Sequence, residues 1–233
     1  MAPILYKLAA SPPSNAVLIL ADIIGLKLEV RDLNIFPLEP GVSAGRLKLN
    51  PMSTVPVLEE GKFIISESHA IMKYLVSKYG GQKAKMLYPS DMRRRALVDQ
   101  AMFFDASLAK YLPIFYISPK AIEFPVPFYD RDGPTATVKT AIDKTYGVVE
   151  ASLGAHAYIA TDHLTIADIS LAATIFAMQS VHNLDPDKFP RTAAWKARLE
   201  EHPSVKEHLS LCTMVLDGII TLALTTTPVY RII

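Results

Sequence analysis

The stretch LNPMSTVPVLEEGKFIISESHAIMKYL, residues Leu49–Leu75, decides the fold. Val55–Leu58 and Phe63–Ile65 have the apolar composition of short strands, and the glycine-containing segment between them is typical of a hairpin turn. From Ser66 onward the apolar residues follow helical spacing, which Gly80 and Gly81 interrupt. The stretch therefore predicts an antiparallel hairpin that is followed by a helix.

The residues before this stretch predict a parallel unit. Ile4–Leu8 is a strand candidate, and the helical pattern after it begins with two prolines behind Ser11 and ends at Gly25. Leu28–Leu33 has the composition of a second strand, and Phe36–Gly45 is irregular. The order β-α-β, irregular segment, β-β-α predicts an α/β sandwich of thioredoxin type.

The residues after this stretch carry helical patterns and predict a second domain. Gln82–Ser90 lacks periodicity and is interpreted as a linker, so we expect an α/β domain over residues 1–82 and an all-α domain over residues 91–233. The first predicted helix of the second domain has Leu97, Ala101, Phe104 and Leu108 on its apolar face. The predicted helices cover residues 95–111, 135–153, 165–181, 192–201 and 205–224.

Composition restricts the classes of function. The chain has 233 residues and a formal net charge of +1, which argues against nucleic-acid or membrane-surface binding. Its apolar runs are interrupted before they reach the roughly 20 residues of a membrane span. The single cysteine, Cys212, lies in an apolar setting and is interpreted as a packed thiol in a reducing compartment, so we expect a cytoplasmic protein. The six histidines lack metal-ligand spacing, and we expect no metal site.

Three short motifs can bind a ligand, and each also has a purely structural interpretation. A cis bond at Val55–Pro56 would free the Val55 backbone to pair with an extended peptide, whereas an ordinary proline at a strand start would not. Glu67-Ser68 at a helix N-terminus suits the ammonium and carboxylate of an α-amino acid, but the motif in isolation favours capping of that helix by Ser66. Ser11 can donate to an anion such as a thiolate or serve as an N-cap.

A fourth motif has a structural role alone. The segment Thr165-Ile166-Ala167-Asp168 has the form of a capping box in which Asp replaces the usual Glu. We interpret it as a device for folding and assign it no chemistry.

The chain resembles the cytosolic glutathione transferases, in particular the insect delta and epsilon classes or an unclassified insect class. The resemblance covers nearly the whole chain and is carried by Leu8–Ser14, Leu49–Leu58, Ser66–Leu75 and Leu164–Asp168. It implies the glutathione transferase fold, in which an α/β thioredoxin-like N-terminal domain precedes an all-α C-terminal domain. It also implies glutathione as a co-substrate, no metal, and a homodimer formed through Glu67–Tyr79 and Arg95–Tyr111.

The same resemblance implies the roles of individual residues. Ser11 would hydrogen-bond the glutathione sulfur and favour its thiolate. The glutathione-binding residues would be Ser53, Thr54, Val55, Pro56, Glu67, Ser68 and His69. An apolar co-substrate would contact Pro13, Tyr111, Ile114, Phe115, Leu211 and Val215, although core packing explains each of these six equally well.

This sequence departs from the family pattern at two of these positions. Ser53 stands where delta and epsilon enzymes usually have histidine, and His69 stands where arginine is common. Lost charge-assisted hydrogen bonds cost about 1.5–3 kcal/mol each when nothing replaces them. The leading hypothesis is therefore a transferase that conjugates glutathione to apolar electrophiles, with possible peroxidase activity. The first alternative is a non-catalytic or weakly catalytic binding protein for hydrophobic molecules, and the second is a structural or translation-associated module.

Overall fold

The computed structural model describes residues 2–33, 49–52, 54–108, 129–130, 133–154 and 156–226. Its first part is a four-stranded sheet in the order β2-β1-β3-β4, in which β1 and β2 are parallel and the other neighbours are antiparallel. The strands are β1 (Ile4–Lys7), β2 (Glu29–Asp32), β3 (Val57–Glu60) and β4 (Phe63–Ser66). The predicted order of strands and helices is confirmed for the described residues, and the predicted irregular segment Phe36–Gly45 lies outside them.

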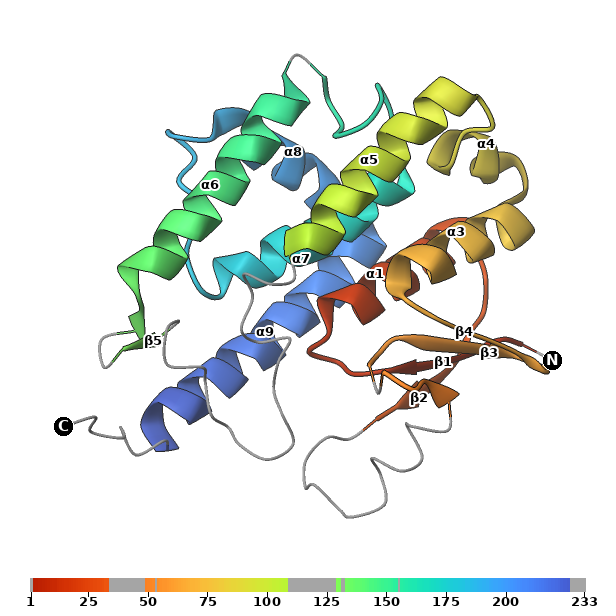
Figure 1. Cartoon of the computed structure of the whole chain (residues 1–233), viewed down its shortest axis with the longest axis horizontal. Helices are drawn as coiled ribbons and strands as arrows, with labels where there is room; N and C mark the ends of the chain where they lie inside the picture. Colours follow the sequence, from red (N-terminus) through yellow and green to blue (C-terminus); the bar gives the residue numbers. More distant parts are fainter. Residues whose placement is uncertain are drawn as a thin grey trace.

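Two helices cover the face of the sheet that is turned toward the rest of the molecule (Figure 1). Helix α1 (Pro12–Ile24) connects β1 to β2, and helix α3 (Ser68–Tyr79) follows β4. The end of α1 is the predicted one, because Gly25 adopts a left-handed conformation with φ 75° and its N–H bonds back to Asp22. The two helices pack on each other and bury the apolar side of the sheet.

The segment interpreted as a linker contains two short helical elements. A 3₁₀ turn (Gly81–Lys83) runs into α4 (Ala84–Leu87), and the Lys83 ammonium donates to the Ile23 carbonyl. Leu87 is buried against the core. Elements of three or four residues show no periodicity, so the sequence pattern did not reveal them.

The second part is helical and surrounds one buried helix. Helix α7 packs against α1, α5 and α9, and nearly all of its side chains are buried. In Figure 1, α7 lies between α5, α1 and α9. The helices are α5 (Met92–Leu108), α6 (Ala136–Leu153), α7 (Ile166–Gln179), α8 (Pro190–Glu200) and α9 (Pro203–Thr226), and a small hairpin pairs β5 (Tyr129–Asp130) with β6 (Gly133–Pro134).

The structure corrects three details of the sequence prediction in this part. Helices α8 and α9 begin two residues early, at Pro190 and Pro203, because proline is tolerated in the first turn. The β5–β6 hairpin lies between the helices predicted at 95–111 and 135–153, where no strand was predicted. The apolar face of α5 is the predicted one only in part, since Ala101 and Leu108 are buried but Leu97 is 49% exposed. The charged residues around Leu97 make this helix weakly amphipathic and hide its phase.

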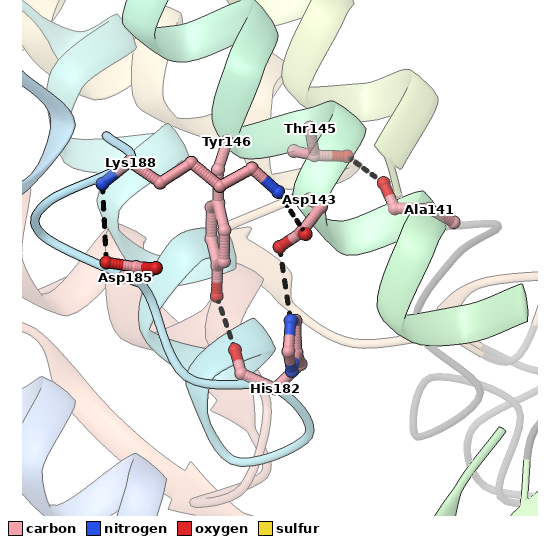
Figure 2. A network of polar contacts seen from close by, with 7 residues as sticks. All are labelled: Ala141, Asp143, Thr145, Tyr146, His182, Asp185 and Lys188. Atoms are coloured by element: carbon pink, nitrogen blue, oxygen red, sulfur yellow. Dashed lines mark hydrogen bonds and ion pairs between the residues drawn. The ribbon is translucent and has the colours of Figure 1, made fainter. Parts of the chain in front are cut away.

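A polar network attaches the segment that connects α7 and α8 to helix α6 (Figure 2). The Asp143 carboxylate lies 2.6 Å from the Lys188 ammonium and 3.1 Å from the His182 Nε2. The Tyr146 hydroxyl donates to the His182 backbone carbonyl at 2.8 Å. Lys188 lowers the pKa of Asp143, and this keeps the carboxylate charged. The network thus links Asp143 and Tyr146 of α6 to residues between α7 and α8.

Within the part of the chain that the structure describes, no helix is long and apolar enough to cross a bilayer.

Candidate active site

The register of the sheet brings the three predicted ligand-binding motifs to one edge. Val57 pairs with Ser66 across β3 and β4, so one further step places Pro56 opposite Glu67. Val57 also pairs with Tyr6 of β1, whose chain continues toward Ser11. Antiparallel pairing thus gathers residues that are more than 50 positions apart in sequence.

The first motif, Ser11, is the N-cap of α1. Its Oγ accepts a hydrogen bond from the backbone N–H of Ser14 at 3.3 Å, so the N-cap interpretation is confirmed. The first turn of α1 carries no acidic side chain that would compete with an anion for the positive end of the helix. The role of Ser11 toward a thiolate stays a prediction, and N-capping leaves the hydroxyl hydrogen free to perform it.

A residue that the sequence reasoning missed holds Ser11 in place. The Asn15 side-chain amide donates to the backbone carbonyls of Ala9 at 2.8 Å and Ser11 at 2.9 Å. Asn15 is buried, so these bonds satisfy groups that water cannot reach. The available signal was a polar side chain on the apolar run of a helix, between Pro13 and Val17.

The second motif contains the cis bond. The Val55–Pro56 peptide is cis, as the ligand-binding interpretation required. The β1–β3 ladder ends at Val57, so the Val55 backbone lies beyond the paired residues. The turn before it is fixed by Asn50, whose amide donates to the backbone carbonyl and the hydroxyl of Thr54 at 3.1 and 2.9 Å. Thr54 is exposed and Val55 half-buried, while Ser53 lies outside the described residues.

The third motif has an unusual backbone. Glu67 is the N-cap of α3 and has φ 71° and ψ 110°, a left-handed conformation that costs a non-glycine residue about 1–3 kcal/mol. The alternative prediction, a cap supplied by Ser66, is wrong, because Ser66 ends β4 and α3 has no side-chain cap. The first turn of α3 beside Ser68 therefore offers N–H groups to an outside acceptor.

His69 connects this helix to the helical part of the molecule. Its Nε2 lies 2.9 Å from Asp105 Oδ2 and 2.8 Å from the Ser170 hydroxyl. Asp105 is buried on α5, and it also accepts hydrogen bonds from Ser170 at 2.5 Å and from Thr174 of α7 at 2.6 Å. The predicted contact between His69 and glutathione is therefore restricted to the other ring nitrogen, Nδ1.

The structure describes some of the residues predicted to contact an apolar co-substrate. Leu211 and Val215 share one face of α9 at i,i+4 spacing, and Leu211 is 44% exposed. Core packing is therefore the wrong interpretation of Leu211, whereas Val215 packs against the core at its margin. Pro13 is half-buried at the start of α1. Tyr111, Ile114 and Phe115 lie outside the described residues.

Cys212 also lies on α9 and is buried. Burial raises the pKa of its thiol to about 12, so the thiol stays protonated at neutral pH. The packed-thiol interpretation is confirmed. The described residues include no group of three or more His, Cys, Asp or Glu side chains that could hold a metal ion.

The fold and the site define a class: a thioredoxin-like domain with a cis-proline edge, joined to a helical domain. Models of the glutathione S-transferase N-terminal and C-terminal domains match residues 5–83 and 123–210. Glutathione S-transferase D7 of Anopheles gambiae is 35% identical over 201 residues, which cover 86% of this chain and 87% of that protein. The chain therefore belongs to the glutathione S-transferase family, whose members are enzymes that use glutathione as co-substrate.

Solved structures of insect proteins support this assignment. An epsilon-class glutathione S-transferase from the housefly Musca domestica has a TM-score of 0.82 and 34% identity, over 95% of this chain and 98% of that one. A glutathione transferase homolog from Drosophila mojavensis, solved with bound glutathione, has a TM-score of 0.78 and 33% identity, over 94% and 96% of the two chains. The resemblance to the delta and epsilon classes is thus confirmed.

Proposed function

We propose that this chain is a glutathione transferase that conjugates the glutathione thiolate to apolar electrophiles and works in detoxification. The observation that carries the proposal is the convergence at one sheet edge of Ser11, the cis Val55–Pro56 bond and the uncapped start of α3. A serine hydroxyl, an unpaired extended backbone and a helix N-terminus match the thiol, peptide and amino-acid groups of glutathione.

The binding mode follows from the order of these groups. The cysteinyl backbone of glutathione pairs with Val55, and the γ-glutamyl carboxylate accepts from the Ser68 hydroxyl and the free N–H groups of α3. The Glu67 carboxylate accepts from the γ-glutamyl ammonium. Ser53, Thr54, Pro56 and His69 complete the site, with His69 acting through Nδ1. The thiol then lies beside Ser11.

The chemistry depends on the protonation state of the sulfur. The Ser11 hydroxyl donates to the thiolate and the start of α1 adds positive potential, so the thiol pKa falls below its reference value of about 8.5. The thiolate attacks the electrophilic carbon, the carbon–sulfur bond forms, and the leaving group departs with the bonding electron pair. No covalent bond to the enzyme is needed, because proximity supplies the rest of the rate enhancement.

The apolar co-substrate binds where the two parts of the chain meet. We propose that Leu211 and Val215 of α9, together with Pro13, contact it, with Tyr111, Ile114 and Phe115 completing the surface. Leu211 supports this proposal because it exposes 44% of its surface on a helix whose opposite face is buried.

A homodimer and a cytoplasmic location are also proposed. Helix α5 exposes Met92 and Phe103 by 84% and 73%, and Met52, near the sheet edge, is 68% exposed. Large apolar side chains this exposed on one helix are typical of an interface. Arg93, Arg94 and Arg95 begin the same helix and would lie at the rim of that interface.

The test combines glutathione titration with conjugation of a general aromatic electrophile and reduction of an organic hydroperoxide. We expect heat on titration, a measurable conjugation rate, and a sharp loss of that rate in Ser11→Ala with unchanged thermal unfolding. Conjugation that is equally fast in Ser11→Ala would remove Ser11 from the mechanism. Failure of glutathione to produce heat or raise the melting temperature would refute the proposal.

One observation favours a second candidate, a binding protein for hydrophobic molecules. Asp105 and Ser170 hold the His69 Nε2, so His69 can offer glutathione only its other ring nitrogen. An arginine, which is common at this position in the family, would offer a planar and permanently charged group with several donors. Binding of apolar dyes without conjugation above background would support this candidate. Dye binding together with conjugation would support the transferase.

A further inference from the structure

Within the described residues, the Ser14 hydroxyl has one hydrogen-bond partner, and that partner is Ser11. Ser14 is fully buried one turn into α1, and its Oγ donates to Ser11 Oγ at 3.0 Å. The backbone N–H of Ser14 reaches the same oxygen at 3.3 Å. Ser11 Oγ therefore accepts twice from a single residue.

This contact is not the usual role of a side chain at that helix position. A polar side chain at the third position of a helix normally accepts from the N-cap backbone N–H. Here the Ser11 N–H already donates to the Leu8 carbonyl at 2.9 Å. The Ser14 hydroxyl is thus released from capping and is directed at the Ser11 hydroxyl instead.

Occupation of the two acceptor lone pairs of the Ser11 hydroxyl determines the role left to its hydrogen. A serine hydroxyl has one donor hydrogen and two acceptor lone pairs. Both lone pairs are occupied by Ser14, so the remaining function of the Ser11 hydroxyl is to donate. A hydroxyl that accepts hydrogen bonds is also polarised into a stronger donor. Donation is the role that stabilisation of a thiolate requires.

Because of two prolines, the Ser11 hydroxyl is the main connection between the N-terminus of α1 and a ligand. Pro12 and Pro13 have no N–H, so the first backbone donor inside α1 is that of Ser14, and it points to Ser11 Oγ. The positive end of α1 thus reaches a bound sulfur through the Ser11 hydroxyl. Asn15 holds the Ser11 carbonyl on the other side and keeps this geometry.

We propose that Ser14 is a positioning residue that fixes the Ser11 hydroxyl as a donor and so strengthens its hydrogen bond to the glutathione thiolate. The inference rests on the proposed function of Ser11. It predicts an effect on the ionisation of bound glutathione, with little effect on its affinity, because Ser14 itself does not contact the ligand.

The test is a spectroscopic titration of the thiolate in the glutathione complex of the full chain. In Ser14→Ala we expect the pKa of the bound glutathione thiol to rise by about 0.3–0.7. At a pH below that pKa the conjugation rate should then be about twofold to fivefold lower than in wild type, and above it the two rates should be equal. Ser14→Cys keeps the size of the side chain with a weaker donor and should be intermediate. The control for the loss of an oxygen atom is Ser180→Ala, because the buried Ser180 hydroxyl has no hydrogen-bond partner among the described residues.

A double-mutant cycle separates positioning through Ser11 from a general structural effect. In the Ser11→Ala background, Ser14→Ala should leave the thiol pKa unchanged. An equal rise in both backgrounds, or no rise in the single variant, would overturn the inference while Ser11 kept its role. If Ser11→Ala alone left the thiol pKa unchanged, the proposed function of Ser11 would fail first. If Ser14→Ala does not fold, the same comparison is made with Ser14→Cys.

Discussion

Replacing Asp168 should destabilise the protein strongly, because four donors from three segments meet at its carboxylate. Oδ1 accepts from the Ile159 backbone N–H at 2.8 Å and from the Trp195 indole at 3.0 Å. Oδ2 accepts from the backbone N–H and the hydroxyl of Thr165, each at 2.9 Å. Asp168 has no exposed surface. Asp168 therefore joins the start of α7 both to α8 and to the segment that precedes α7.

The magnitude follows from the number of donors left without a partner. In Asp168→Ala the Thr165 hydroxyl can rotate, whereas the two backbone N–H groups and the Trp195 indole cannot. An orphaned buried donor costs about 1–3 kcal/mol, so three of them cost about 3–6 kcal/mol after partial relaxation. That is a large part of the 5–15 kcal/mol typical of a folded domain, and it corresponds to a melting temperature lower by about 10–20 °C.

A graded series tests the count of bonds. Asp168→Asn keeps an oxygen for Ile159 and Trp195 but turns an amide toward the Thr165 N–H, so its loss should be about half that of the alanine variant. The control is Asp162→Ala, because its carboxylate is 88% exposed and pairs with His156, and we expect a change within about 0.5 kcal/mol.

The assay is thermal and urea unfolding followed by circular dichroism and by fluorescence of the single tryptophan, Trp195. The native emission should also change in both Asp168 variants, since the indole loses or alters its acceptor. An alanine variant that melts within about 3 °C of wild type, or an asparagine variant as stable as wild type, would refute the count of buried donors.

Three further outcomes are expected. Hydrogen bonds from Lys78, Tyr74 and Tyr79, in that order of size, lower the pKa of Glu60 to about 2. Glu60 therefore stabilises the fold above its unfolded pKa of about 4.5, and this contribution is lost as pH falls toward 2. The melting temperature of Glu60→Gln should accordingly fall less than that of wild type over this pH range. Asn15→Ala should lower the free energy of unfolding by about 1–3 kcal/mol and reduce conjugation, with the thermal midpoint and the rate as readouts. Phe103→Glu should shift the chain toward a monomer in size-exclusion chromatography with light scattering, whereas Val148→Glu, at an exposed valine of α6, should not.

Local signals predicted the elements that depend on local physics. The prolines and glycine around α1, the glycine turn between β3 and β4, and the capping box at Thr165–Asp168 each determine structure within a few residues. Their positions were therefore readable from the sequence. The domain limits at residues 82 and 91 stay predictions, although the family models match residues 5–83 and 123–210.

The contacts between distant helices could not be predicted in the same way. Asp105 occurs on a helix whose buried face was predicted only in part, and its partners Ser170 and Thr174 lie 65 and 69 positions away. The available signal was the i,i+4 spacing of two hydroxyl side chains on the apolar helix α7, which indicates a buried polar partner. The identity of that partner depends on how α3, α5 and α7 pack, and packing is not local information.

Glu67 shows why the site departs from local rules while the rest of the chain follows them. A serine stands on either side of it, and a shift of one residue would give α3 an ordinary cap without a left-handed backbone. The structure instead keeps φ at 71° and leaves the first turn uncapped, at a cost of about 1–3 kcal/mol. A capped helix would present its N–H groups to its own serine, and a ligand carboxylate would then have to displace that serine. The strained arrangement leaves those donors available for the carboxylate of the amino-acid head group that we propose to bind there.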